Sequence, residues 1–497
     1  MAAQVKEYEG RRISGKLEEN IRLLDALFQY DATLRSKRIR VRGVQEYDCA
    51  VYYFDGMVNA ELLNDSIIKP LLMVKTERTE DSLSGFVAKQ VLFASEVKPQ
   101  ADLAELLRAM LYGDTLLLID GAPDALIINT KGWKTRSITE PEDERVLRGP
   151  REGFSETAMT NLAMIRRKLL TPDLCFRMYR VGRRSETQVF VCYLESLADP
   201  VIVKKLIERV QAIDMDGVLE VNYIEEQIRD HRYSAFKTTG TTERPDIVAA
   251  RLLEGRVALV VDGTPVVMTV PYLFSENFQS DEDYYLNFLI ASVNRALRYL
   301  CFLLSISVPG FFIGAVTFHK ELLPTSLAIT ITKLRSGIPF PILTECLLLL
   351  LVFEILKESG VRMPQSLGHA LSIVGGLVVG EAAVNAKVIS APMLIVVALS
   401  GISGLVVPRL KEAIIYLRVA LVLASALFGL YGFIAGLLLA AIIVLDHDSF
   451  GVNYTVSLHR ADFQSLKDTL FRAAWHRMIR RPPISRDAVR MKERREG

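Results

Sequence analysis

The chain has 497 residues, of which 24% are charged, and a formal net charge of +2. This length allows about two to four domains, and so balanced a charge argues against a nucleic-acid-binding protein. The five cysteines form no Cys-x-x-Cys pair and no cluster with histidine, which argues against a structural zinc site or a disulfide framework and fits a reducing compartment. They are Cys49, Cys175, Cys192, Cys301 and Cys346.

The first 36 residues are polar and predict an N-terminal helical extension over 1–36. Leu17, Ile21 and Leu24 recur at helical spacing, and Ser14 is placed to cap that helix. The opening segment MAAQVKEYEGRRISGKLEEN contains no apolar core, so we expect no cleavable secretory signal. The soluble part of the chain is therefore expected to lie in the cytoplasm.

The next 250 or so residues predict a soluble α/β region with two similar subdomains. We place α/β subdomain 1 at 37–139, a charged linker and helix at 140–170, and α/β subdomain 2 at 171–285. Both subdomains close with a similar hairpin, because LLLIDGAPDALI (116–127) aligns with ALVVDGTPVVMT (258–269). This alignment indicates an internal duplication with the element order β-β-α…α-β-β.

The two hairpin turns share a polar motif. Asp120, Gly121 and Pro123 fall on Asp262, Gly263 and Pro265 in the alignment. Gly and Pro explain such a turn by backbone geometry, and one carboxylate per turn is weak evidence for a metal or ligand, so we expect a structural role. No P-loop, G-x-G-x-x-G, G-x-S-x-G or H-E-x-x-H motif occurs. We therefore expect neither an enzyme nor a bound cofactor.

Residues 286–446 predict an all-α polytopic membrane domain, because a bilayer is crossed by about 20 mostly apolar residues. Candidate spans cover 295–318, 341–357, 388–407 and 413–445. The last run is too long for one span, and its glycines indicate a break near Tyr431 or one long tilted helix. The Gly/Ala-rich segment 366–386 indicates a broken or re-entrant segment.

The two ends of the membrane domain are expected on the same side. Arg295 and Arg298 begin the first span, and the C-terminal tail, 447–497, is basic, which favours the cytoplasm for both. The number of complete crossings is then even. Four spans with re-entrant pieces and six spans both satisfy this condition.

Ionisable residues interrupt the apolar region, at a cost of about 2.5–3.5 kcal/mol for each one near the bilayer centre. They are Glu345, Glu354, Glu381, Lys387 and His369, the last expected to be a structural hydrogen-bonding residue. A spacing of nine residues puts Glu345 and Glu354 on opposite helix faces, and Asn385 shares a face with Glu381. Each glutamate can line a pore or lie at a helix end or packed interface. Glu381 is the leading pore or gate candidate, with Lys387 as a salt partner.

Prolines and glycines shape the same region. Pro339 and Pro341 are expected to start or break a helix, since proline cannot continue the backbone hydrogen bonding. Gly376 and Gly380 form a small-xxx-small face that lets two helices approach closely.

These segments resemble the A subunit of the GerA-type nutrient germinant receptors of endospore-forming bacteria. The resemblance extends over roughly residues 12–480 and rests on several separate motifs. They are RPDIVAARLLEGRVALVVDGTPVVMTVP (244–271), FQSDEDYY (278–285), PFPILTE (339–345), FEILKESGVRMPQSLG (353–368, with Arg362 and Pro364), SIVGGLVVGEAAVNAKVIS (372–390) and PRLKEAIIYLR (408–418). Cys346 departs from the pattern, because a larger or purely apolar residue is expected there.

The resemblance implies a place in the spore inner membrane with the duplicated soluble region on the cytoplasmic side. It also implies a homo-oligomer that conducts cations when nutrient binds, acting with a transporter-like, nutrient-binding B subunit and a C lipoprotein subunit. Within this family, an accessory membrane channel that acts with dipicolinate release remains an alternative.

The residues themselves leave other classes open. A nutrient transporter component fits the broken helices, although no inverted repeat is visible among the apolar segments, and a pure scaffold also fits. A cation channel is favoured by the intramembrane carboxylates, since rings of Asp or Glu select cations. The soluble half is expected to be a coupling and assembly module, because it carries no catalytic motif and ends directly at the first span.

Overall fold

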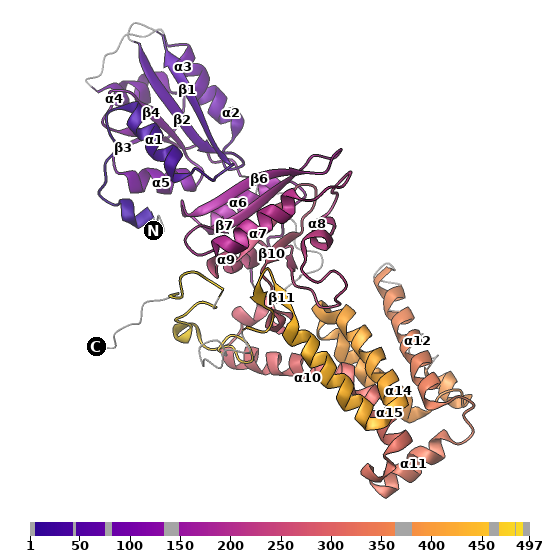
Figure 1. Ribbon diagram of the computed structural model, residues 1–497. Helices are drawn as coiled ribbons and strands as arrows, with labels where there is room; N and C mark the ends of the chain where they lie inside the picture. The colour runs from indigo at the N-terminus through magenta and orange to yellow at the C-terminus, as the bar shows by residue number, and fades with distance from the viewer. Residues whose placement is uncertain are drawn as a thin grey trace, which may run out of the picture.

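The computed structural model describes residues 5–42, 46–74, 82–133, 149–362, 380–456, 467–482 and 484–490. Two α/β units come first along the chain, and a bundle of helices follows them (Figure 1). This architecture confirms the predicted fold class, an α/β soluble region followed by an all-α region. The segment after the last bundle helix returns to the second unit, where the Phe450 N–H donates to Asp230 (2.7 Å).

The first unit is a five-stranded antiparallel sheet in the order β1-β2-β4-β5-β3, with helices on both faces. Its strands are β1 (Leu34–Val41), β2 (Tyr47–Phe54), β3 (Val97–Gln100), β4 (Thr115–Ile119) and β5 (Ala125–Ile128). Its helices are η1 (Val5–Tyr8), α1 (Leu17–Leu27), α2 (Ala60–Leu63), η2 (Asn64–Ile68), α3 (Lys69–Leu72), α4 (Leu83–Phe86), η3 (Val87–Val91) and α5 (Leu103–Leu111). Alternate strand residues face opposite sides, so Tyr52 packs with α1 and α5 whereas Val51 packs with the other helices.

The second unit repeats this plan in the order β6-β7-β9-β10-β8. Its strands are β6 (Leu174–Val181), β7 (Thr187–Leu194), β8 (Gly240–Thr242), β9 (Val257–Val261) and β10 (Val267–Val270). Its helices are α6 (Ala158–Lys168), α7 (Pro200–Gln211), α8 (Val221–Ile228), α9 (Pro245–Leu253), η4 (Phe274–Phe278) and η5 (Asp281–Tyr284). Each unit thus has a fifth strand, β3 or β8, beyond the predicted order. Each also includes a leading helix, α1 or α6, which packs on its sheet.

The turn aspartates show how closely the two units match. Asp120 accepts a hydrogen bond from the Leu17 N–H at the start of α1 (2.9 Å), and Asp262 accepts one from the Ala158 N–H at the start of α6 (2.9 Å). A carboxylate at a helix N-terminus satisfies a free N–H and favours the helix dipole. Each turn aspartate therefore caps the leading helix of its own unit, and the shared cap supports the internal duplication.

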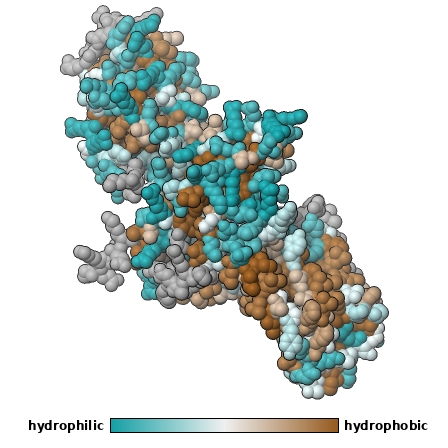
Figure 2. Space-filling model, in the orientation of Figure 1, coloured by the Kyte–Doolittle hydropathy of each residue, from teal (hydrophilic) through white to brown (hydrophobic). Residues whose placement is uncertain are grey.

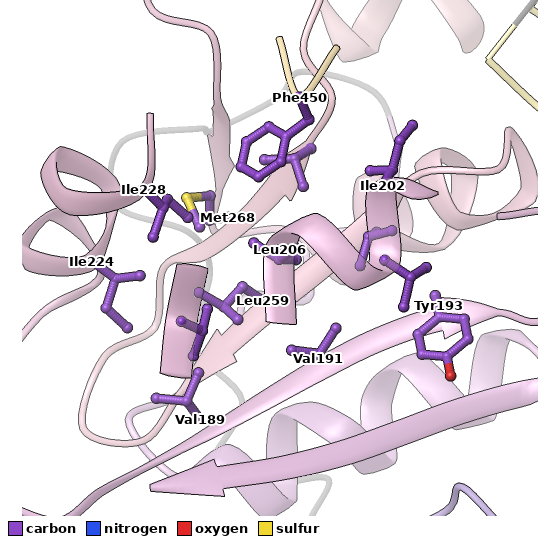
Figure 3. Packing of buried hydrophobic residues seen from close by; sticks show 14 of the residues in the cluster. Val189, Val191, Tyr193, Ile202, Leu206, Ile224, Ile228, Leu259, Met268 and Phe450 are labelled. Atoms are coloured by element: carbon purple, nitrogen blue, oxygen red, sulfur yellow. The ribbon is translucent and has the colours of Figure 1, made fainter. Parts of the chain in front are cut away.

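The core of the second unit also holds the residues that directly follow α15 (Lys411–Asp446). Leu206 of α7 and Ile224 of α8 pack against Leu259 of β9, and Phe450 inserts among them from beyond the bundle (Figure 3). Phe450 is 2% exposed, so this contact buries a complete aromatic side chain. The end of the bundle is therefore anchored in the core of a soluble unit.

A buried ion pair joins the two units. Arg166 of α6 pairs with Asp31, the residue that precedes β1 by three positions, and both side chains are at most 2% exposed. The guanidinium also lies over the rings of Phe54 and Phe176, at 4.2 and 4.8 Å from their centroids. Removing one partner of such a pair leaves a buried charge without compensation, so the two units are held in one arrangement.

Within the described residues, four longer helices form the bundle. They are α10 (Phe288–Phe318), α12 (Ile342–Arg362), α14 (Ala391–Leu405) and α15 (Lys411–Asp446), with the shorter η6 (Lys320–Leu322), α11 (Thr325–Arg335) and η7 (Pro408–Leu410) between them. After α15 come β11 (Asp448–Ser449), β12 (Val452–Asn453) and η8 (Trp475–Arg477). Pro341 lies directly before α12, and its carbonyl accepts the Glu345 N–H (3.0 Å), as expected of a proline at a helix start.

The long helix α15 folds back on itself at Gly429. The backbone there is non-helical, with φ +62° and ψ −145°, a region that glycine tolerates. Leu421 before the break packs with Phe433 after it, so the two halves form a hairpin. Each half is about 26 Å long at 1.5 Å per residue, close to the thickness of a bilayer core. The predicted break near Tyr431 is confirmed, two residues earlier.

The surface of the bundle is apolar. Among the described residues, α10 and the segment Pro408–Asp446 are long and apolar enough to cross a membrane by length and composition. Figure 2 shows hydrophobic residues gathered over the bundle and hydrophilic residues over the two units. Exposed leucines and aromatic residues such as Leu300, Phe311 and Leu427 lie on this surface. Large exposed apolar patches mark a membrane or protein contact.

Candidate functional site

The two acidic residues of α12 contact different partners. Glu345 is buried at the start of α12, where its carboxylate accepts hydrogen bonds from the N–H and hydroxyl of Ser390, the residue before α14; the N–H bond is 2.6 Å long. Arg335 at the end of α11 pairs with it at 3.5 Å. Glu345 thus holds three helix ends together. Glu354, on the other face as its spacing predicts, contacts neither of these residues.

Glu354 points to a second cluster, in the middle of the bundle. It pairs with Lys357 at 2.6 Å and with Arg418 of α15 at 3.9 Å. Arg418 is almost completely buried and donates to the Ser305 carbonyl (3.0 Å) and hydroxyl (2.7 Å) of α10. An ionisable residue inside an apolar bundle needs such partners, and this one connects three helices.

The same cluster also reaches the fourth helix. The Ser400 hydroxyl of α14 donates to the Ser305 carbonyl (2.7 Å), and Arg418 donates to the Ser400 carbonyl (3.4 Å). A Cβ at Gly404 would lie 2.9 Å from the Ser305 hydroxyl, so a glycine leaves room for the contact. We call Ser305, Glu354, Ser400 and Arg418 the bundle cluster. Sequence reasoning did not single out Arg418 or the two serines.

Glu381 and its neighbours lie on the outside of the bundle. Glu381, Asn385 and Lys387 are all exposed, in the short segment that leads into α14. Gly380 lies against Leu394 of α14, because a Cβ atom added to Gly380 would be 3.5 Å from the Leu394 side chain. Among the described residues, no ion pair joins Glu381 to Lys387, whose φ of +55° turns the chain just before α14.

Some predicted positions receive no structural assignment. Pro364, His369 and Gly376 lie outside the described residues, and Arg362 is the last residue of α12. Pro339 precedes α12 by three residues. Among the described residues, no group of three or more His, Cys, Asp or Glu side chains is arranged to hold a metal ion.

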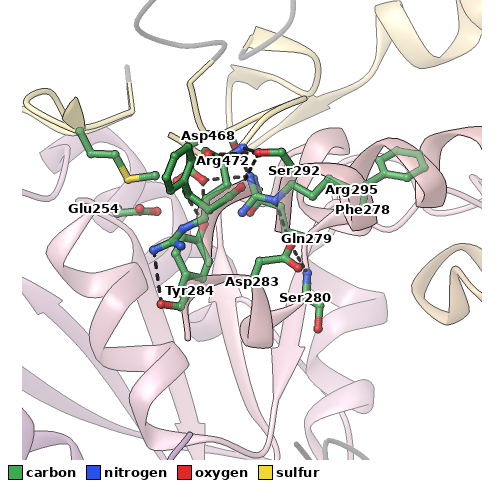
Figure 4. Close-up of polar contacts among 12 residues, drawn as sticks. Glu254, Phe278, Gln279, Ser280, Asp283, Tyr284, Ser292, Arg295, Asp468 and Arg472 are labelled. Atoms are coloured by element: carbon green, nitrogen blue, oxygen red, sulfur yellow. Dashed lines mark hydrogen bonds and ion pairs between the residues drawn. The ribbon is translucent and has the colours of Figure 1, made fainter. Parts of the chain in front are cut away.

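A buried charge network ties the first bundle helix to the soluble part. Arg295 of α10 is fully buried and donates to Asp283 of η5 (2.9 Å). It also donates to Asp468 (2.9 Å), which lies in the C-terminal segment, a name we use for the described residues 467–482 and 484–490. Arg298 donates two hydrogen bonds to the carboxylate of the same Asp283, at 2.8 and 3.0 Å. Figure 4 shows this network at the junction of the unit and the bundle. Two arginines that the sequence indicates as membrane-boundary charges therefore also have specific intramolecular partners.

The C-terminal end of α15 contacts the second unit through two stacked histidines. The rings of His231 and His447 lie 4.4 Å apart, and His447 interacts with the Ser234 hydroxyl (2.5 Å) and the Ile443 carbonyl (2.6 Å). Burial, with the neighbouring His231 ring as a smaller cause, lowers the pKa of His447 below its usual value. A second ring nearby disfavours the protonated form.

Acidification is expected to loosen this contact. Because the folded pKa of His447 is lowered, the unfolded state binds more protons, so the contact contributes stability above the ordinary histidine pKa of about 6.5 and loses it as the pH falls. Hydrogen exchange of residues 443–454 in the full-length protein should accelerate between about pH 7 and 5 after correction for intrinsic rates. The slope should shrink in His447→Gln, and equal slopes would rule out this origin.

The fold and site define a class of protein: a duplicated α/β module joined to an apolar helical bundle that carries buried charges. The model of the Bacillus/Clostridium GerA spore germination protein family matches residues 22–484. This chain belongs to that family, as its sequence motifs predict.

Several proteins are similar to this chain. Spore germination protein KA of Bacillus subtilis is 37% identical over 90% of this chain and 82% of its own length. An uncharacterized membrane protein of the same organism, YfkQ, is 36% identical over 79% of this chain and 76% of its own. The crystal structure of the N-terminal domain of the A subunit of the Bacillus megaterium spore germinant receptor GerK3 is 29% identical, covers 53% of this chain and 97% of that domain, and gives a TM-score of 0.43.

Proposed function

We propose that this chain is the A subunit of a nutrient-responsive spore germination receptor and forms an oligomeric, ligand-gated cation channel in the spore inner membrane. It acts with a transporter-like B subunit that binds the nutrient and with a C lipoprotein subunit. Membership of a family of spore germination proteins supports the role in germination. The apolar surface of the bundle supports the membrane location.

The arrangement of the ends supports a single-sided topology. Both the start of α10, through Arg295, and the segment after α15, through Phe450, contact the second unit or its flanking segments. A bundle whose two ends return to one soluble unit crosses the membrane an even number of times. We place the N-terminal region and the C-terminal tail in the cytoplasm.

One observation carries the channel proposal: an exposed carboxylate on an apolar bundle. Glu381 is exposed, and among the described residues none forms an ion pair with it. Facing lipid, such a charge costs about 2.5–3.5 kcal/mol near the bilayer centre, so it faces water or another protein surface instead. In a ring of subunits, repeated Glu381 and Asn385 side chains provide the carboxylates and amides of a cation path.

Replacing Glu381 tests this role. Glu381→Gln keeps the side-chain shape and removes the charge, so we expect nutrient-triggered potassium release from spores to slow by at least about tenfold, as one lost charge contact of about 1.4 kcal/mol predicts. Glu321→Gln, at an exposed glutamate in η6, is the matched control and should behave as the wild type. Equal release from both variants, at equal protein levels, would contradict a cation path at Glu381.

A further inference from the structure

A cavity of about 400 Å³ lies where the second unit, the bundle and the C-terminal segment meet. Its walls come from α9 and the residues just after it, from the stretch that contains η4 and η5, and from Arg409 of η7. The lining is completed by Trp475, Arg481 and Arg490. This volume falls in the range of small-molecule pockets, about 300–1,000 Å³. An occupant would therefore touch three parts of the chain at once.

The cavity lies at the soluble-side edge of the bundle. Tyr284 and Tyr285 line it, three to four residues before α10, and Arg409 lines it two residues before α15. The two helices that are apolar enough to cross a membrane, among those the structure describes, start beside it. At this level a ligand can enter from the aqueous phase or from the head-group layer of a bilayer.

The charged wall of the cavity has more hydrogen-bond donors than acceptors. Five arginines line it against four carboxylates, and each guanidinium offers five N–H donors and no acceptor. The carboxylates already have partners: Glu276 pairs with Arg256 at 2.5 Å and Glu254 with Arg490 at 2.6 Å. Arg256 is 3% exposed, and its Nε–H has no partner among the described residues. A ligand that supplies a hydrogen-bond acceptor would satisfy this N–H. Because the lining has a net positive charge, an anionic acceptor is favoured.

The rest of the lining is apolar and partly aromatic. Trp475, Tyr285 and Leu253 line the cavity and remain 50%, 42% and 46% exposed. Ala250 of α9 also lines the cavity and presents only a methyl group. A ligand that fits both walls joins an anionic group to an apolar or flat portion.

We propose that this cavity binds an organic phosphate: a phosphate group held by the arginine wall around Arg256 and Arg490, attached to an apolar portion that packs on Trp475 and Tyr285. Arginine matches phosphate because its planar fork donates two parallel hydrogen bonds. An anionic phospholipid head group and a soluble phosphate ester share this chemistry. Because the ligand contacts the second unit, η7 and the C-terminal segment together, its binding stabilises their junction.

The sequence supplies an internal probe for this site. The chain has two tryptophans, Trp133 in the first unit and Trp475 in the cavity. In a full-length Trp133→Phe protein, the fluorescence of Trp475 alone reports the cavity. We expect a saturable change on titration with dihexanoyl phosphatidylglycerol, and none with dihexanoyl phosphatidylcholine, whose head group carries no net charge. Phenyl phosphate and inorganic phosphate are titrated in parallel.

The parallel titrations decide the source of the ligand. Saturation by phosphatidylglycerol alone assigns a lipid head group, whereas saturation by phenyl phosphate as well assigns a soluble phosphate ester. Inorganic phosphate should bind at least tenfold more weakly than either, because it lacks the apolar portion. No saturable signal from any anion, or equal binding of phosphatidylcholine, would overturn the proposal.

Two pairs of variants test the walls separately. Ala250→Phe fills the apolar side and should abolish saturation, whereas Ala212→Phe at the exposed end of α7 should leave it unchanged. Arg490→Gln should weaken binding at least tenfold, since a charged hydrogen bond contributes about 1.5–3 kcal/mol. Its control is Arg183→Gln, which likewise removes an arginine paired with one carboxylate, Asp214. Unchanged binding in both Ala250→Phe and Arg490→Gln would place the ligand elsewhere.

Discussion

Replacing Arg418 with methionine is expected to destabilise the helical bundle by about 3 kcal/mol, near the lower end of the range for breaking a buried ion pair. The side chain is 4% exposed and holds α10, α12 and α14 together through Ser305, Glu354 and Ser400. After its loss, Glu354 keeps, within the described part of the chain, an ion pair with Lys357. The lower end applies because the Glu354 side chain is 27% exposed and its distance to Arg418 is 3.9 Å.

Thermal unfolding of the purified full-length protein in detergent measures this loss. Arg418→Lys keeps the positive charge but loses the planar guanidinium that donates several hydrogen bonds at once. We therefore expect a loss of stability between those of the wild type and Arg418→Met. The double variant Arg418→Met/Glu354→Gln should cost less than the sum of the two single variants, because each single variant already removes the ion pair between these residues. If Arg418→Met costs no more than Arg183→Met at an exposed site, the bundle cluster does not hold the helices together.

Replacing Arg295 with methionine is expected to release the C-terminal segment from the junction, at a cost of about 3–5 kcal/mol. Arg295 and Asp283 are fully buried, and Arg295 donates to both the side chain and the carbonyl of Asp468. Arg298 still neutralises Asp283 in the variant. The group that loses its cation is the Asp468 carboxylate, which keeps a contact with the Tyr284 hydroxyl (3.1 Å).

Limited proteolysis is the measurement for this variant. Cleavage within residues 467–490 should become at least tenfold faster than in the wild type, because a released segment is open to protease. Arg477→Met, an exposed arginine in the same segment, removes a charge without a buried partner and serves as the control. Equal cleavage of both variants would show that Arg295 does not anchor the segment.

The duplicated soluble region could be predicted because its signals are local. The Asp-Gly-x-Pro turns repeat in sequence, and the structure gives both aspartates the same capping bond. The fifth strands could not be predicted. Val97–Gln100 contains Lys98 and Pro99, which disfavour a strand, and Gly240–Thr242 has three residues. Both strands form because the hairpin beside them offers an open edge.

In the helical bundle, too, some positions could be predicted from local spacing and others could not. Helical spacing was enough to separate Glu345 from Glu354, because nine residues correspond to two and a half turns. It could not identify Arg418, which follows Lys411 and Glu412 so closely that it resembles a helix-end charge. Its partners Ser305 and Ser400 lie 113 and 18 residues away in the chain, and only the packing of α10 against α14 and α15 brings them together.

The central claim is that this chain contributes to a nutrient-gated cation path, and electrical recording tests it most directly. The receptor subunits are reconstituted in a planar bilayer under a potassium chloride gradient, and nutrient is added to one side. We expect a nutrient-dependent current whose reversal potential lies close to that of potassium and whose size falls in Glu381→Gln. Saturable nutrient uptake without current, or a current selective for chloride, would contradict it.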